Sequence, residues 1–283
     1  MTNGTGYALA ALLCYGVGDF IYKRSARAGV QANHFLMGQA WCFCPLVVLY
    51  AIATGTLDIR APALWGGLAG LFIFVGFYQF LRSLVTGPVS INAPIFRLNF
   101  IVTALLAIVI LGEPLTGLKV AGFALALVAT WLLVGGAGAG ARVAISRPSL
   151  LQVLSATLFF GAANFFHKMG LHQGMSPETM LAAQAVVFIS LSTLFTRVTE
   201  GTVRLPPQTW RHAVPAAIVL IAAFLFLLHG LSVGPASVLV PIAQMGFVVT
   251  AALAIVFFGE RFTGRMAAGL SAATVALAML AFG

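Results

Sequence analysis

Charged residues are scarce in this sequence. Only 7% of its 283 residues are Asp, Glu, Lys or Arg, and six of them are acidic. Soluble domains have about 25% charged residues. A chain that is 61% hydrophobic, with a mean hydropathy of +1.04, cannot cover its surface with polar groups. The composition excludes an ordinary soluble domain. It predicts an all-α integral membrane protein, because backbone groups in lipid must bond within their own helices.

Cysteine is also rare. Cys14, Cys42 and Cys44 all lie in apolar segments, and the last two are only two residues apart, so on a helix they point to different faces.

No His, Cys, Asp and Glu cluster has the spacing of a metal site, and no Gly-x-x-x-x-Gly-Lys-Ser/Thr loop is present to bind a nucleotide. The sequence therefore predicts no catalytic residues, no metal and no cofactor.

Basic residues outnumber acidic ones, for a net charge of +9, but most of them lie between the apolar runs. Membrane proteins use this distribution to fix their orientation and to meet anionic headgroups. We therefore expect contact with membrane lipids and not with nucleic acid. Residues 1–6 contain no Lys or Arg, so the basic region of a cleaved signal peptide is missing and we expect the first apolar run to be retained.

Apolar runs of about 20 residues, the length that crosses a bilayer, follow one another along the chain. A Gly- and Ala-rich stretch near the middle is typical of a flexible linker and divides these runs five and five. We expect a first five-helix repeat at 1–135, a linker at 136–149 and a second five-helix repeat at 150–283. The ten predicted transmembrane helices are 5–23, 34–54, 63–83, 88–111, 115–135, 150–169, 178–196, 212–231, 235–258 and 263–282.

The two halves repeat each other. Adding 147 to the residue numbers between 87 and 117 returns nearly the same motifs, and an offset of 145 does so near the start of the chain. Two polar positions break this symmetry, since Arg97 is matched by Gln244 and Asp19 by Asn164. The identical pairs include Gly16/Gly161, Lys23/Lys168, Gln39/Gln184, Gly87/Gly234, Pro94/Pro241, Thr103/Thr250 and Glu113/Glu260.

Five spans per half is an odd number, so the second copy must enter the membrane from the opposite side, which gives two inverted repeats. The loop charges agree with this. In the first half the basic residues gather in the first connection, at 23–27, whereas in the second half they gather in the second connection, at 197–211. The positive-inside rule then places the connections after spans one, five, seven and nine in the cytoplasm and both termini outside.

Two five-span halves, each with a Gly-Glu near the end of its fourth span (Gly112-Glu113 and Gly259-Glu260), resemble the drug/metabolite transporter superfamily. The chain is most similar to its EamA-type permeases, over nearly its whole length. This resemblance implies secondary transport, often export, of small organic metabolites through a central cavity by alternating access. It also implies a multi-pass protein of the inner (plasma) membrane with both termini inside. Some members are amino acid exporters, including a bacterial exporter of aromatic amino acids. Whether the chain is a monomer or a homodimer stays open.

Arg97 is the first candidate site residue, because it lies about ten residues from either end of its span, near the bilayer midplane. A charge at that depth costs at least about 2.5–3.5 kcal/mol, so it must face a partner or a wet cavity. One reading is that Arg97 binds the carboxylate of a substrate, since its planar fork suits one. The other is a structural pair with Asp19. Pro94, three residues earlier, removes a backbone bond and opens the helix locally.

Asp19 is the proton-coupling candidate, because it is the acidic residue that lies well inside a span. A pair with Lys23, one turn later, is equally compatible with the sequence. Asn164, its match in the second half, does not titrate, so any proton coupling would belong to the first half alone.

The other predicted substrate-binding residues are uncharged. Gln244 replaces arginine on the face equivalent to that of Arg97, and Asn164 lies at the position equivalent to Asp19. Tyr78 and Gln79 are the polar members of an aromatic third span, where they would line a cavity for an apolar or aromatic side chain.

Further polar residues receive structural predictions. Gln39 and Gln184 are expected to bond between helices. His167 and His229 lie near span ends, where we expect them to reach the membrane interface. Glu113 and Glu260 are each expected to cap the N-terminus of the next helix, where a negative charge is favourable.

Three functions compete at this point. A secondary transporter of carboxylate-bearing metabolites, with amino acids first among them, agrees with the buried arginine and with the resemblance. The alternative is an integral-membrane enzyme acting on lipid-linked substrates, for which six acidic residues are few. A purely structural subunit would have no need for an arginine near the midplane.

Overall fold

The computed structural model describes residues 3–86, 92, 95–134, 146–258 and 263–282. Helices and short turns account for these residues, and six of the described helices are long and apolar enough to cross a membrane. The elements are α1 (Thr5–Arg27), α2 (Ala32–Ala53), η1 (Ala61–Ala63), α3 (Leu64–Thr86), α5 (Asn99–Leu111), α6 (Gly117–Val134), α7 (Arg147–His172), α8 (Pro177–Glu200), α9 (Pro207–Val233), α10 (Ala236–Gln244), α11 (Phe247–Phe258) and α12 (Gly264–Phe282).

Local capping sets several of these boundaries. Ser146 and Ser176 lie just before α7 and α8, and each side chain accepts a hydrogen bond from a backbone N–H in the first turn. Gly201, at φ +68°, ends α8 in the left-handed conformation that glycine adopts without strain. The predicted linker, 136–149, therefore extends too far, because α7 already begins at Arg147. Residues 135–145 of that linker lie outside the described residues.

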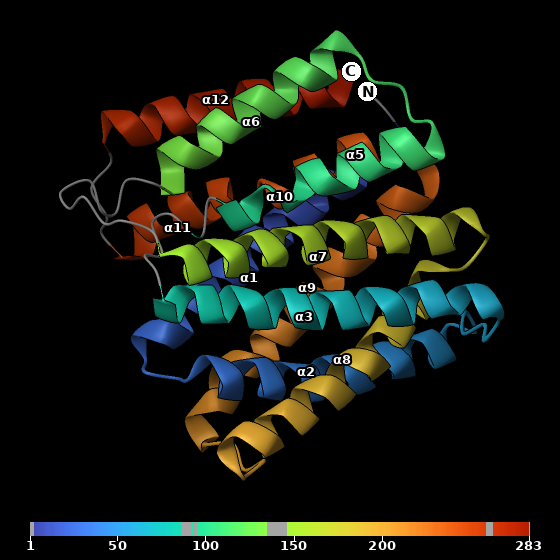
Figure 1. Ribbon diagram of the computed structural model, residues 1–283, viewed down its shortest axis with the longest axis vertical. Helices are drawn as coiled ribbons and strands as arrows, with labels where there is room; N and C mark the ends of the chain where they lie inside the picture. The colour runs from blue at the N-terminus through green and yellow to red at the C-terminus, as the bar shows by residue number, and fades with distance from the viewer. Residues whose placement is uncertain (1–2, 87–91, 93–94, 135–145, 259–262, 283) are drawn as a thin grey trace.

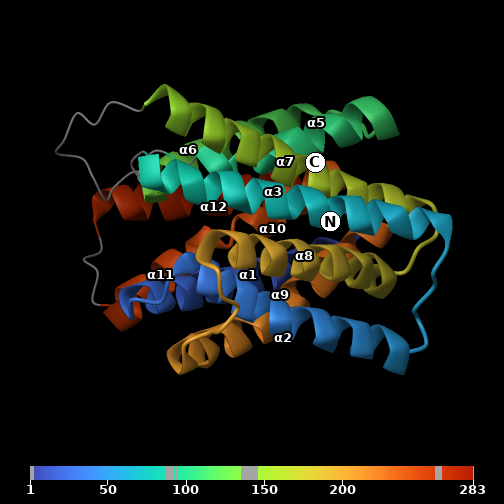
Figure 2. The same ribbon diagram turned by 60° about the horizontal axis from the view of Figure 1, so that its bottom comes forward.

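The helix ends gather at two opposite ends of the molecule, as Figures 1 and 2 show. At one end lie both termini, together with the 53–64, 111–117, 172–177 and 233–236 connections; we call it the terminal end. At the other, Gln208 Nε2 donates to Ala28 O (2.8 Å), and His34 pairs with Glu200 (2.6 Å). We call this second end the basic end, after its exposed arginines Arg24, Arg27, Arg147, Arg197, Arg204 and Arg211.

The two halves are packed into each other rather than side by side. The most extensive contacts join α3 to α7, α6 to α12, α1 to α9, α3 to α8 and α2 to α8, so each pair takes one helix from each half. The contacts of equivalent helices match between the two halves. α3 packs on α7, and its equivalent α9 packs on α1. In the same way α5 packs on α7, and α10 and α11 of the equivalent span pack on α1. The repeat seen in the sequence is therefore also a repeat of contacts.

Two glycines let helices of opposite halves approach closely. A Cβ added to Gly16 would lie 2.4 Å from Val249 Cβ, and one added to Gly161 would lie 2.5 Å from Val102 Cβ. Thr250 Oγ1 donates to Gly16 O (3.0 Å), and Thr103 Oγ1 donates to Gly161 O (2.9 Å). These matched contacts are small-residue crossings, the usual way in which helices associate in lipid.

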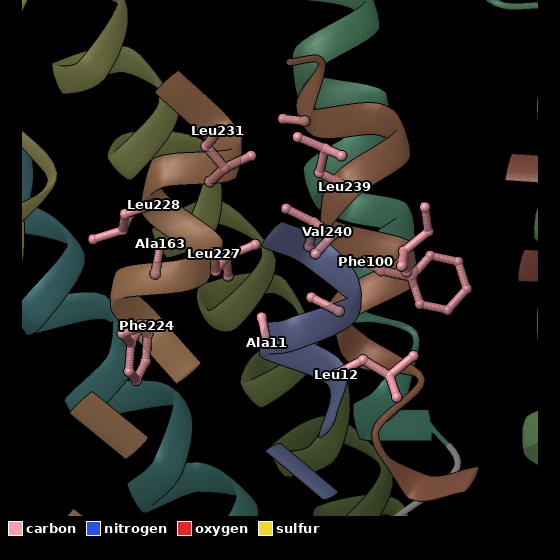
Figure 3. Close-up of a cluster of buried hydrophobic side chains, with 14 of the residues drawn as sticks. Ala11, Leu12, Phe100, Ala163, Phe224, Leu227, Leu228, Leu231, Leu239 and Val240 are labelled. Atoms are coloured by element: carbon pink, nitrogen blue, oxygen red, sulfur yellow. The ribbon is translucent and has the colours of Figure 1, made fainter. Parts of the chain in front are cut away.

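Buried side chains from both halves fill the centre of the bundle (Figure 3). Lipid tails are as apolar as these side chains, so close packing and not water exclusion holds such a core together. The labelled members come from five helices: Ala11 and Leu12 of α1, Phe100 of α5, Ala163 of α7, Phe224, Leu227, Leu228 and Leu231 of α9, and Leu239 and Val240 of α10.

Candidate functional site

The fourth predicted span of each half is broken at the same place. In the second half the predicted span 235–258 is two helices, α10 and α11, which separate at Met245, whose N–H donates to Ile242 O (3.1 Å). In the first half the chain is helical at 95–97, turns at Leu98, whose N–H donates to Ile95 O (3.0 Å), and continues as α5. A continuous helix was expected for each of these spans, and that prediction is wrong, because the described part of each span contains a turn. Pro94 lies outside the described residues.

Each break adjoins a predicted site residue, because Arg97 and Gln244 directly precede Leu98 and Met245. A tight turn of this kind leaves helix-end backbone groups without their usual partners, and transporters commonly place binding sites at such discontinuities near the midplane. The two breaks therefore place Arg97 and Gln244 beside helix ends whose backbone groups can accept or donate further hydrogen bonds.

Arg97 Nη2 donates to Asp19 Oδ2, so the two residues form an ion pair. Asp19 comes from α1, which packs mainly on α9, α10 and α11, whereas α5, which follows Arg97, packs on α7 and α10. The pair thus joins α1 to the segment that leads into α5, and both helices also pack on α10. Its side chains are 22% and 31% exposed, so the guanidinium is accessible within the bundle. Of the partners weighed for Asp19, the structure has Arg97; the Lys23 side chain lies outside the described residues.

The equivalent residues of the second half are neutral and more deeply buried. Asn164 is 3% exposed and Gln244 is 9% exposed. His167, which lies beside Gln184, is fully buried and faces the Phe224 ring edge-on at 6.3 Å. The prediction that His167 reaches the membrane interface is therefore wrong. In the first half, Tyr22 OH donates to Gln39 Oε1, which confirms the predicted bond between helices.

Tyr78 lines an aromatic pocket between α2, α3 and α8, near the basic end. Its cavity volume is about 20 Å³, and the surrounding space, open solvent included, is about 350 Å³. The Tyr78 ring meets Phe195 edge-on at 4.6 Å, and Phe77, also in the lining, lies 6.5 Å from the ring of Phe96, the residue before Arg97. Gln79 is half-buried on α3 and does not line this pocket. The lining residues are Asn33, Leu36, Phe74, Phe77, Tyr78, Phe188, Ser192, Phe195 and Thr196.

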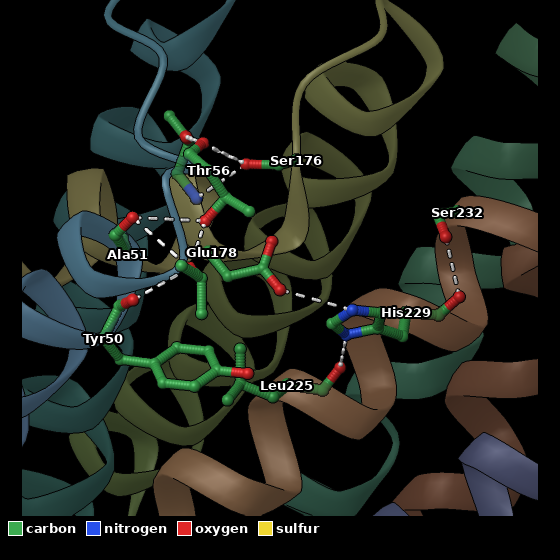
Figure 4. Close-up of polar contacts among 10 residues, drawn as sticks. Tyr50, Ala51, Thr56, Ser176, Glu178, Leu225, His229 and Ser232 are labelled. Carbon is green, nitrogen blue, oxygen red and sulfur yellow. Dashed lines mark hydrogen bonds and ion pairs between the residues drawn. The ribbon is translucent and has the colours of Figure 1, made fainter.

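A second polar group lies at the terminal end (Figure 4). Glu178 Oε1 lies 3.3 Å from His229 Nε2, and the other ring nitrogen of His229 contacts Leu225 O at 2.8 Å. Ser176 Oγ donates to Thr56 O (2.9 Å) and so ties the start of α8 to the α2–α3 connection. Sequence reasoning missed Glu178, which lies at the start of its span and is nearly buried. His229 faces this carboxylate, a partner that the prediction of an interfacial His229 did not include.

The described residues contain no group of three or more His, Cys, Asp and Glu that could hold a metal ion. What they do contain is one accessible arginine–carboxylate pair beside a broken helix, its neutral counterpart in the other half, and an aromatic pocket nearby. These are hydrogen-bonding and apolar groups, the two kinds of surface that line binding sites for small organic molecules.

Comparison with known proteins supports the fold. A solved structure entitled "Crystal structure of protein" superposes with a TM-score of 0.83 at 19% identity, over 98% of this chain and 98% of that chain. At that identity the likeness shows the fold alone. A search of curated proteins finds no match.

A bundle of apolar helices in two interlocked repeats defines a multi-pass membrane protein. The particular family is shown by the sequence: residues 2–135 and 147–282 each match the EamA-like transporter family. The chain belongs to that family. It is therefore a membrane transporter of small molecules and an integral membrane protein, as the resemblance implied.

Proposed function

We propose that this chain is a secondary transporter that exports small carboxylate-bearing metabolites, amino acids first among them, by alternating access through a central cavity. The observation that carries the proposal is the Arg97–Asp19 ion pair beside the break in the fourth span. Arg97, Gln244 and Asn164 form its polar part, and Tyr78 belongs to the pocket that takes the substrate's side chain. Gln79 remains a secondary candidate on the same helix.

Asp19 supports the choice of substrate class, because it already presents a carboxylate to Arg97 within the bundle. Another carboxylate of similar size can take its place and use the same guanidinium fork. A guanidinium has donors only and no acceptor, so a substrate that offered it only an amine would gain nothing there. Binding is thus an exchange of one carboxylate for another on Arg97.

This exchange gives Asp19 its proposed part in proton coupling. Once a substrate holds Arg97, Asp19 is left as a carboxylate without its cationic partner inside the bundle, which is costly unless it takes up a proton. Asn164, the equivalent residue of the second half, offers no such proton site. Coupling in this proposal therefore depends on Asp19 alone.

The proposed architecture has ten spans in two inverted repeats, 1–135 and 150–283, joined at 136–149. Its support is that the equivalent helices α1 and α7 begin at opposite ends of the molecule (Figure 1). The exposed arginines of the basic end favour a cytoplasmic location for that end in the inner membrane, with both termini outside. The resemblance implied termini inside, and a C-terminal reporter that is active only in the cytoplasm distinguishes the two.

The test of this function is uptake into proteoliposomes by the purified protein. We expect counterflow of radiolabelled amino acids, competed by the free acids but not by the corresponding amines that lack the carboxylate. A pH-sensitive dye in the same liposomes should report substrate-dependent proton movement, which Asp19→Asn abolishes. Equal competition by amines and acids would rule out the carboxylate as the recognised group.

The aromatic pocket leads to a prediction on specificity. Ser192→Leu adds apolar volume inside the pocket. We expect amino acids with large side chains to compete at least about tenfold less well, because a side chain that no longer fits loses about 1–3 kcal/mol of binding free energy. Alanine and glycine should be unaffected. Competition series on the variant measure this directly.

The matched control is Ser190→Leu, two residues away on α8, where the side chain is exposed. It changes the composition of α8 in the same way without filling the pocket. An equal loss for small and large substrates in Ser192→Leu would show that the pocket does not hold the substrate's side chain.

A further inference from the structure

Glu113 does not cap the helix that follows it. Its Oε1 accepts a hydrogen bond from the backbone N–H of Ala236, and its Oε2 accepts one from that of Ser237, both at 2.8 Å. These two groups belong to the first turn of α10, in the other half of the protein. The next helix, α6, is capped instead by Thr116, whose hydroxyl accepts from Lys119 N (3.2 Å). Glu260, the repeat equivalent of Glu113, lies outside the described residues.

Two lysines complete this contact. Lys119 Nζ donates to Pro114 O (2.7 Å) and to Ser237 Oγ (3.2 Å), and its side chain is buried. Lys168, from α7, donates to the carbonyls of Leu231 and Gly234 at 2.7 Å each, at the end of α9. Ser237 links Glu113 and Lys119, since its N–H donates to the carboxylate and its hydroxyl accepts from the ammonium group. The charged side chains of Glu113, Lys119 and Lys168 thus hold the 111–117 connection and α7 against the α9–α10 connection.

The helix held in this way is a short and separate piece. All nine residues of α10 are buried, and it ends at the Met245 break, where Gly246 packs against Gly16 of α1. Its N-terminal end carries the positive end of a helix dipole, which a carboxylate stabilises. Its last residue is Gln244, about 12 Å away along the axis at 1.5 Å per residue. What fixes the first turn of α10 therefore also fixes the position of Gln244.

The two sides of the proposed site differ in access. The Arg97–Asp19 pair, toward the basic end, is partly exposed, whereas Gln244 and Asn164, toward the terminal end, are buried. Alternating access requires that the closed end open in turn, and a closed end must be held by contacts that can be broken. Glu113 supplies such contacts between parts of the two repeats.

We propose that Glu113, with Lys119 and Lys168, is a releasable latch that holds α10 against the first repeat and closes the terminal end of the transport pathway. Glu113 is thus a positioning residue that acts on Gln244 through α10. The pathway and its opening rest on the proposed transport function, but the latch itself is measurable without substrate.

The test is labelling of a reporter thiol at Gln244→Cys, in a background where Cys14, Cys42 and Cys44 are alanine. A membrane-impermeant maleimide is applied separately to each face, in whole cells and in inside-out vesicles. Adding Glu113→Gln keeps the side chain's shape but removes its charge and puts an N–H₂ group against a backbone donor. We expect labelling from the face of the terminal end to rise about tenfold or more, and not from the other face.

Two further variants make the result interpretable. Glu200→Gln removes a carboxylate that pairs with His34 at the basic end, so it should leave labelling from the terminal end unchanged. Ala236→Pro removes one of the two N–H donors at a first-turn position that proline tolerates, and it should raise labelling as Glu113→Gln does. It also serves if Glu113→Gln fails to fold.

Unchanged labelling in a folded Glu113→Gln or Ala236→Pro protein, within about twofold of the parent, would overturn the latch. Carboxylate transport by the parent protein is scored separately. If labelling rises but no carboxylate is transported, the latch stands and the proposed substrate class falls. If carboxylates are transported but labelling does not rise, the proposed substrate class stands and the latch falls.

Discussion

Arg97→Ala should abolish most carboxylate transport while the protein still reaches the membrane and folds. The substitution removes the guanidinium that binds Asp19 in the resting protein and, in our proposal, the substrate in transport. Loss of a charged hydrogen bond costs about 1.5–3 kcal/mol, which corresponds to a roughly ten- to a hundredfold loss of affinity. Binding and counterflow in proteoliposomes measure the effect.

Arg97→Lys separates charge from geometry. It keeps the positive charge but loses the planar fork, so we expect an intermediate to full loss of binding. Arg211→Ala is the control, because it removes an arginine that is exposed at the basic end. Wild-type flux in a folded Arg97→Ala protein would leave the Arg97–Asp19 pair as a structural contact and would remove the main argument for a carboxylate substrate.

Gly16→Ala should destabilise the fold markedly. The added Cβ would lie 2.4 Å from Val249 Cβ and 2.6 Å from Gly246 O, so α1 must move away from the break between α10 and α11. That movement also lengthens the bond from Thr250 to Gly16 O. Overpacking of this kind costs about 1–3 kcal/mol, or a melting temperature lower by roughly 2–12 °C for a chain of this size. Thermal unfolding in detergent, followed by size-exclusion chromatography, measures it.

Gly18 provides a matched control on the same helix, since nothing lies within 4 Å of a Cβ added there. Gly18→Ala should leave the melting temperature unchanged or raise it, because alanine favours helix by about 1 kcal/mol over glycine. Gly161→Ala should behave like Gly16→Ala, with Asn99 O and Val102 in place of Gly246 O and Val249. Equal melting temperatures for Gly16→Ala and Gly18→Ala would contradict a close crossing at Gly16.

The sequence by itself determined the class of protein and most of the helix positions. Apolar length and scarce charge are local properties, and lipid requires helices wherever such runs occur. The predicted spans 5–23, 34–54 and 63–83 accordingly lie within α1, α2 and the η1–α3 region to within a few residues. The repeat also indicated which positions are equivalent, and the matched contacts of Gly16 and Gly161 follow that equivalence.

Only the tertiary structure decided which partners the polar residues have. Asp19 had two possible cations in the sequence, and the structure pairs it with Arg97, 78 residues away. Glu113 caps α10, 123 residues away, and not the helix beside it. His167 is buried against α9 although it lies near the end of its own helix.

These pairings cannot be predicted from the local sequence, because they depend on which helix faces meet when the two halves pack into each other. The break at Met245 has the same origin. A run of apolar residues is compatible with one helix or with two. The turn there is stabilised by contacts from outside the run, namely Gly16 of α1 against Gly246 at the turn itself and Glu113 at the start of α10. In lipid, where apolar burial hardly distinguishes one helix arrangement from another, such close contacts and buried polar bonds select the arrangement.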